Sequence, residues 1–371
     1  MTHLIDLVRN GGAFVVVLGI LVFVHELGHY LAARSQGMHV EAFSIGFGPK
    51  IFGWTDRVGT LWKVSWLPLG GYVKLHGQER PEDVAPEVRA AWKPGRTFHG
   101  KSVGSRAIVI AAGPIANFLL ATVLFSGLFM AIGRPVPSAG PVVGDVSVGS
   151  AGEKAGLLAG DRIEIIDGTP IASFEDLRRV VSGKPGQTVA LSVRRGGELR
   201  SIPATIDSRK AADGAALGVL GVRGATEYQP VGPLQAIATG AEQTWTVSVA
   251  TLQGLGQMLS GSRTTDELSG PLGIAQLSGQ VAQLGIVSLI SFIAVLSVNL
   301  GLINLFPIPV LDGGYLVIYA AEAIRGRPLP QRLQEYGFRA GFALLAGLFV
   351  FATWNDLSRL GLFRWVSGLI G

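Results

Sequence analysis

Long apolar stretches separated by polar and charged segments dominate this chain. Three of them, residues 11–33, 107–132 and 286–305, reach the length of a membrane-spanning helix, about 20 mostly apolar residues. A fourth apolar run, residues 340–354, is short for a span, so we expect it to extend through Arg339 or to cross a thinned bilayer. The pattern predicts a polytopic α-helical membrane protein of about four transmembrane helices.

Between the second and third spans the pattern changes to short alternating segments punctuated by glycine. Residues 188–194 and 199–206 alternate like two strands joined by Gly196 and Gly197, and residues 174–181 have a helical pattern. We therefore expect a small inserted α+β domain over residues 135–208. Residues 209–284 mix apolar residues with Gln, Thr and Ser, which indicates an amphipathic segment lying at the membrane interface or packed beside that domain.

A polar, basic region, residues 35–106, follows the first span. It contains two strand-like runs, residues 61–67 and 72–75, separated by the turn signal at residues 68–71, which predicts a β-hairpin. Two interpretations remain open for this hairpin. Its exposed edge accepts an extended peptide by β-augmentation, or it only packs over the membrane face.

Composition and charge support a membrane protein and predict its orientation. Charged residues make up 15% of the chain, against about 25% in a typical soluble domain. The net charge of +5 comes from Lys and Arg that crowd residues 34–106 and recur within 325–339, so we expect both loops on the cytoplasmic side and the inserted domain in the periplasm. No nucleic-acid motif accompanies this charge.

The chain has no cysteine, so any metal must be held by His, Asp or Glu. The N-terminal apolar stretch has no clear cleavage site, so it predicts an uncleaved first span rather than a signal peptide.

The pentapeptide His25-Glu26-Leu27-Gly28-His29 lies at the end of the first apolar run. On a helix, residues four apart share a face, so His25 and His29 can present two imidazoles to one Zn²⁺ ion, with Glu26 beside it as general base. Ionisable side chains at membrane depth are expensive and indicate function by default.

A catalytic zinc takes three protein ligands, and Asp312 is the candidate for the third. It follows the third span, where Pro307 and Pro309 must break the helix. Because alternate spans run in the same direction, the C-terminal ends of the first and third spans lie at similar depth in the membrane. The alternative interpretation of Asp312 is an ordinary turn, since Asp-Gly is a common turn dipeptide. Asn304, near the same end, is expected to stabilise an oxyanion or to hold the substrate backbone.

Together these features resemble the site-2 protease family of intramembrane zinc metalloproteases, most nearly the bacterial regulator of sigma-E protease type. The resemblance is carried by HELGH on the first span, the inserted domain, which resembles a bacterial PDZ domain, and the run NLFPIPVLDGG at residues 304–314. It implies a multi-pass protein of the bacterial inner membrane that cleaves single-span proteins, such as anti-sigma factors and remnant signal peptides, within the lipid bilayer. The chain has room for one PDZ domain and not for a tandem pair.

The resemblance also implies two binding segments. The hairpin region would present the substrate as an added strand, with the substrate-binding residues Gly46, Phe47, Gly48, Gly70 and Gly71. In the PDZ domain, a loop would receive the carboxylate of a peptide C-terminus through the backbone amides of Val142, Val143 and Gly144.

Two rival functions come from other classes. A membrane-bound PDZ adaptor with a degenerate metal site would lack activity, but the intact HExxH and the third ligand candidate argue against it. A metal or ion transporter would show paired repeats with matching broken segments, and the sequence shows no such symmetry.

Overall fold

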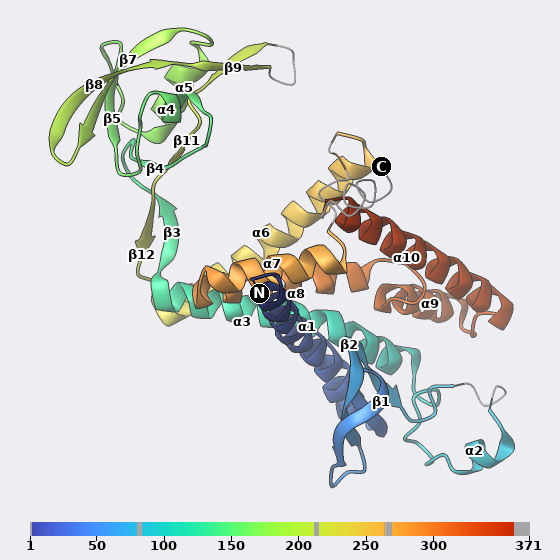
Figure 1. Ribbon diagram of the computed structural model, residues 1–371. Coiled ribbons are helices and arrows are strands. Elements are labelled where there is room, and N and C mark those ends of the chain that lie inside the picture. Colours follow the sequence, from blue (N-terminus) through green and yellow to red (C-terminus); the bar gives the residue numbers. More distant parts are fainter. Residues whose placement is uncertain (1, 80–83, 211–214, 263, 265–268, 360–371) are drawn as a thin grey trace, which may run out of the picture. The chain divides into compact units, whose positions relative to one another are not determined.

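The computed structural model describes residues 2–79, 84–210, 215–262, 264 and 269–359 (Figure 1). The chain divides into two compact units, which we describe separately. The membrane unit comprises Met1–Phe129 and Pro233–Gly371, and the PDZ unit comprises Met130–Gly232.

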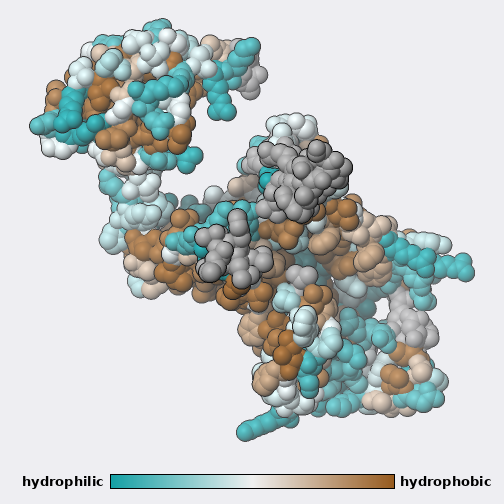
Figure 2. Space-filling model, in the orientation of Figure 1, coloured by the Kyte–Doolittle hydropathy of each residue, from teal (hydrophilic) through white to brown (hydrophobic). Residues whose placement is uncertain are grey.

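Four helices of the membrane unit are long and apolar enough to cross a membrane: α1 (Thr2–Ser35), α3 (Val103–Ile132), α8 (Ile286–Leu305) and α10 (Gln331–Arg359). Their exposed side chains include large apolar residues such as Leu119 and Leu348, and Figure 2 shows apolar residues gathered over the helices of this unit. The prediction of a polytopic helical membrane protein is confirmed, and the fourth helix extends through Arg339 as expected.

Further helices of this unit, among the described residues, are α2 (Pro86–Ala90), α6 (Pro233–Leu259), α7 (Pro271–Gln283) and α9 (Asp312–Arg325). Helix α7 packs against α1 and α8, α6 packs against α8, and α10 contacts α7 (Figure 1). At that last contact, the buried Asp356 carboxylate accepts hydrogen bonds from the amides of Gly270 and Gly273. The polar composition of residues 315–338 predicts a short loop between the third and fourth spans, and this prediction is wrong, because α9 occupies the first part of that range.

A two-stranded element, β1 (Val40–Thr55) and β2 (Leu61–Leu75), packs against α1. Ala42 pairs with both Leu61 and Lys74, so the first half of β1 lies between the two halves of β2. The predicted hairpin is therefore wrong in its pairing: residues 61–67 and 72–75 flank β1, and residues 68–71 lie within β2. The chain reverses at Asp56, whose carboxylate accepts hydrogen bonds from the amides of Val58 and Thr60 and so forms the turn.

The PDZ unit contains a four-stranded sheet of order β6-β5-β7-β8: β5 (Arg162–Ile166), β6 (Thr169–Pro170), β7 (Thr188–Arg195) and β8 (Glu198–Thr205). Its helices are α4 (Ala151–Lys154) and α5 (Phe174–Ser182), and α5 begins with a capping box between Ser173 and Asp176. The core includes the fully buried Ile163, Ile166 and Leu191. This is the small α+β domain that the sequence predicts.

This unit extends beyond the predicted boundary at residue 208. Three further antiparallel pairs join β9 (Asp207–Lys210) to β10 (Ala216–Val219), β11 (Val222–Gly224) to β4 (Val143–Val146), and β12 (Thr226–Gln229) to β3 (Arg134–Pro137). Residues 216–229, expected in an amphipathic segment, therefore belong to the PDZ unit. Strands of three or four residues carry little periodic signal, and the partners of β11 and β12 are distant in sequence.

Candidate active site

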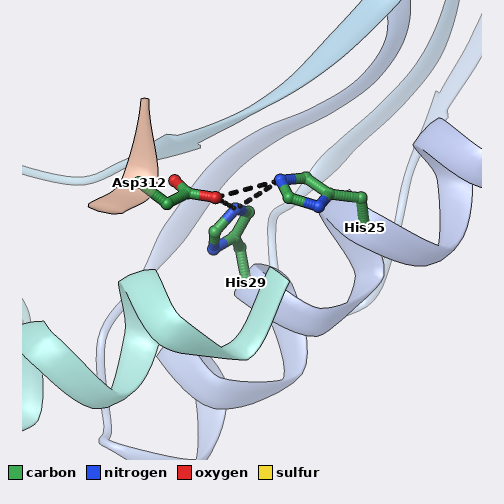
Figure 3. Close-up of side chains that lie close together, drawn as sticks. All are labelled: His25, His29 and Asp312. Carbon is green, nitrogen blue, oxygen red and sulfur yellow. Dashed lines mark hydrogen bonds and ion pairs between the residues drawn. The ribbon is translucent and has the colours of Figure 1, made fainter. Parts of the chain in front are cut away.

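Three side chains that the sequence predicts as metal ligands converge in the membrane unit (Figure 3). The Nε2 atoms of His25 and His29, one turn apart on α1, lie 3.2 Å from each other. The Asp312 Oδ2 atom lies 3.2 Å from His25 Nε2 and 3.5 Å from His29 Nε2. A tetrahedral zinc bound at about 2.0–2.1 Å separates neighbouring ligand atoms by about 3.3 Å. The three atoms therefore fit a zinc ion.

Close backbone packing places Asp312 at this point. The segment between α8 and α9 contains two prolines and one non-glycine residue with positive φ, Val310 at 91°. A Cβ at Gly313 would lie 2.2 Å from the carbonyl oxygen of Leu305, and one at Gly314 would also meet backbone atoms. These two glycines let α9 begin directly against the end of α8, which brings its first residue to the histidines.

Helix α3 packs against both imidazoles. His29 Nδ1 donates a hydrogen bond to the carbonyl oxygen of Val109 at 2.9 Å, which leaves its Nε2 lone pair facing the cluster. A Cβ at Gly113 would lie 2.3 Å from His29 Nε2, and a Cβ at Gly28 on α1 would lie 2.3 Å from the carbonyl oxygen of Ala112. The sequence analysis noted no role for Gly28 or Gly113, because the need for a glycine appears only when two helices touch.

The three residues line a cavity of about 440 Å³ that also includes Glu26 and Asn304. One wall is the end of β2, and a Cβ at Gly71 would lie 3.1 Å from Glu26 Cγ. Asn304 donates a hydrogen bond from Nδ2 to the carbonyl oxygen of Leu300 at 3.0 Å. The predicted general base, on α1, therefore lines the same cavity as the three metal-ligand candidates and contacts the wall formed by the sheet.

The remaining predicted substrate-binding residues lie farther along the sheet. Of the five, only Gly71 lines the cavity. Gly46, Gly48 and Gly70 have φ of 85°, 88° and 96°, a region that favours glycine. A Cβ at Gly70 would lie 2.9 Å from the ring of Phe47. In this structure these four residues shape the bend of the sheet.

The predicted carboxylate loop of the PDZ unit is not free to receive a ligand in this structure. The amide of Val142 donates to the carbonyl oxygen of Gly140, and the amide of Val143 donates to that of Asp161 at 2.7 Å. A Cβ at Gly144 would lie 2.8 Å from Ala225. The structure thus contradicts the assignment of Val142 to Gly144, because this segment is packed between residues 160–163 and β11.

A buried ion pair that the sequence analysis missed lies at another part of the cavity wall. Arg106 of α3 donates from Nη2 to Glu322 Oε2 of α9 at 3.2 Å, and its guanidinium lies 4.8 Å from the ring centre of Tyr319. The pair joins the helix that contacts the imidazoles to the helix that carries Asp312. Only the presence of ionisable residues near predicted spans could have indicated it.

An HExxH pair and a distant aspartate that meet among apolar helices define the class of membrane zinc metalloproteases. The chain belongs to Peptidase family M50, the site-2 protease family, which it matches over residues 13–348. It is 47% identical over 365 residues to "Putative zinc metalloprotease R01501" of Rhizobium meliloti, covering 94% of this chain and 96% of the relative. It is 34% identical over 449 residues to "Regulator of sigma-E protease RseP" of Escherichia coli, covering 94% and 98%.

Among solved structures, a PDZ domain of an SdrC-like protein from Listeria innocua covers 23% of this chain and 92% of its own, with 22% identity and a TM-score of 0.20. The protein is a zinc-dependent metalloprotease of the site-2 type, as the sequence predicts. The four apolar helices and the relatives among regulators of sigma-E protease support a multi-pass protein of the inner membrane.

Proposed function

We propose that this protein is an intramembrane endopeptidase that cuts the transmembrane segments of single-span proteins, with anti-sigma factors and remnant signal peptides as the substrate class. The observation that carries this proposal is the convergence of His25, His29 and Asp312 in a cavity among apolar helices. Such a site lies at the depth where a substrate helix would cross the bilayer.

We propose that these three residues hold the zinc ion. Bound there, zinc supplies polarisation of the scissile carbonyl and a lowered pKa for the attacking water. The Glu26 carboxylate, on the cavity wall, takes a proton from that water and later delivers it to the leaving nitrogen. Asn304, which lines the same cavity, holds the substrate backbone or donates to the developing oxyanion.

The substrate would enter as an added β-strand. Residues 71–75 of β2 pair with residues 40–45 of β1 along one edge, and Gly71, Tyr72 and Val73 line the cavity. A peptide paired with the other edge would be extended, with its backbone beside Glu26. The edge-pairing interpretation of this sheet is therefore favoured over simple packing on the membrane face.

The orientation follows from the positive-inside rule. The Lys-rich and Arg-rich region after α1 and the arginines within residues 325–339 would lie in the cytoplasm, and the PDZ unit in the periplasm. There the PDZ unit would bind peptide C-termini or exclude untrimmed substrates by size. The intact set of metal ligands and base argues against the alternative of an inactive membrane adaptor.

The test is Glu26→Gln, assayed for cleavage of a tagged single-span protein in membranes. We expect cleavage to fall by about 10²–10⁴-fold, the contribution of a general base, while bound zinc is retained. Glu87→Gln, at an exposed position on α2, is the matched control and should cleave at the wild-type rate. Wild-type cleavage by the Glu26 variant would refute the mechanism. Asp312→Ala should lose zinc, and full retention would remove Asp312 from the ligand set.

A further inference from the structure

We propose that Asn117 of α3 is a positioning residue for zinc: its side-chain oxygen accepts a hydrogen bond from His25 Nδ1 and so directs His25 Nε2 toward the metal. This inference rests on the proposed zinc site. The interaction joins α3 to α1, 92 residues apart in sequence.

The geometry of Asn117 supports this role. Its side-chain nitrogen Nδ2 lies 3.1 Å from His25 Nδ1, and the residue is fully buried. The other polar atom of the amide is buried and has no hydrogen-bond partner among the described residues. The contact with His25 is therefore the one hydrogen bond that the structure assigns to this side chain in the part of the chain it describes.

The direction of this hydrogen bond follows from the metal site. His25 Nε2 is the atom that faces His29 and Asp312, so it must carry a lone pair to bind zinc. An imidazole with a lone pair on Nε2 has its proton on Nδ1, and the group that faces Nδ1 must then accept. The oxygen and nitrogen of an amide are assigned from such networks, so the proposal exchanges Oδ1 and Nδ2 of Asn117 relative to the structure and turns Oδ1 toward His25.

In this proposal helix α3 provides a hydrogen-bond acceptor for the Nδ1 atom of each histidine. His29 Nδ1 donates to the Val109 carbonyl, and in the proposed orientation of the amide His25 Nδ1 donates to Asn117 Oδ1. Acceptors of this kind fix the orientation of metal-bound histidines and raise their basicity. A backbone carbonyl cannot be removed by substitution, so Asn117 is the acceptor that an experiment can reach.

The position of Asn117 is itself held by α8. The hydroxyl of Ser297, which is fully buried, donates to the Asn117 carbonyl oxygen at 2.8 Å. A buried polar side chain in an apolar span is costly unless it has a partner. A general interhelical role predicts a loss of stability on its removal, whereas a positioning role predicts a specific loss of zinc affinity.

The test measures zinc affinity of the purified full-length chain in detergent by competition with a chelator. Asn117→Leu keeps the approximate volume but removes the acceptor, and we expect the zinc Kd to rise by about 10–100-fold. Asn117→Asp restores an acceptor oxygen and should bind zinc within about threefold of the wild type. At saturating zinc, Asn117→Leu should recover cleavage.

Asn299→Leu is the matched control. Asn299 lies on α8, and its Oδ1 accepts a hydrogen bond from the Thr251 hydroxyl at 2.9 Å; it does not line the cavity. Its replacement removes a polar contact between helices, so it should lower the melting temperature and leave the zinc Kd unchanged.

Three results would overturn the inference: an unchanged zinc Kd in Asn117→Leu, an equal loss in Asn117→Asp, or an equal loss in Asn299→Leu. If the leucine variant does not fold, Asn117→Ala gives the same comparison with less bulk. Failure of the proposed site itself is separately visible, because His25→Ala would then leave the zinc affinity intact.

Discussion

Replacing Gly113 with alanine should disrupt zinc binding although it removes no ligand. A Cβ at this position would lie 2.3 Å from His29 Nε2, 2.5 Å from His29 Cε1 and 2.9 Å from His25 Cε1. Carbon atoms in ordinary contact are about 3.5–4.0 Å apart, so the His29 ring must move by about 1 Å or more.

That displacement is large compared with the tolerance of a zinc site, whose ligand distances hold within about 0.2 Å. Withdrawal of α3 would relieve the clash only by opening the close contact between Gly28 of α1 and the backbone of Ala112, which has its own cost. Loss of a group that only orients a ligand costs about 10–100-fold in metal affinity, so we expect displacement of a ligand itself to raise the zinc Kd by about 100-fold or more and cleavage at limiting zinc to fall with it.

The assay is zinc content and zinc affinity of the purified chain, with the melting temperature measured with and without zinc. Gly127→Ala is the matched control, because Gly127 is an exposed glycine of the same helix whose added Cβ meets nothing within 4 Å. It should bind zinc as the wild type does. Stoichiometric zinc at wild-type affinity in Gly113→Ala would refute the packing argument.

Two further predictions concern other parts of the chain. Arg106→Met leaves the carboxylate of Glu322, which is 5% exposed, without its charged partner. Loss of one partner of a buried pair costs about 3–5 kcal/mol, so this variant should have a lower melting temperature than the double variant in which both residues are Met. Equal melting temperatures would contradict this prediction. In the PDZ unit, burial would raise the pKa of Asp161, but the Arg195 guanidinium, 2.7 Å from each carboxylate oxygen, and the Leu158 amide hold that pKa below its usual range. This stabilisation is present above the unfolded pKa of about 3.9 and is lost as the pH falls through the folded pKa. The melting temperature of this unit should therefore be constant above about pH 5 and fall below about pH 4, and it should fall less in Arg195→Met.

Local patterns account for what could be predicted of the site. His25 and His29 share a face because of helical geometry alone, and the apolar runs placed them within a span. Asp312 could be associated with them because alternate spans run in the same direction, which requires only a count of spans. These arguments give the depth of the three residues but not the 3.2–3.5 Å separations of their ligand atoms.

Strand pairing was less predictable. The sequence signals at residues 61–75 were real strands, but the turn signal at residues 68–71 did not join a hairpin, because β1 lies between the two halves of β2. For the same reason the PDZ unit was predicted to end at residue 208, whereas in the structure it ends at Gly232. A strand pattern shows which residues extend and which face is buried, whereas the partner strand depends on contacts between distant segments.

The sequence by itself determined the membrane class, the number of spans, the zinc chemistry and the candidate ligands, because hydrophobic length and helical spacing are local properties. Only the tertiary structure decided which residues support those ligands. The imidazoles are contacted from α3 by Gly113, Asn117 and the Val109 carbonyl, which lie 80 or more residues along the chain from the histidines. The contacts that support metal-binding side chains depend on how neighbouring helices pack, and the spacing of residues along one helix does not predict that packing.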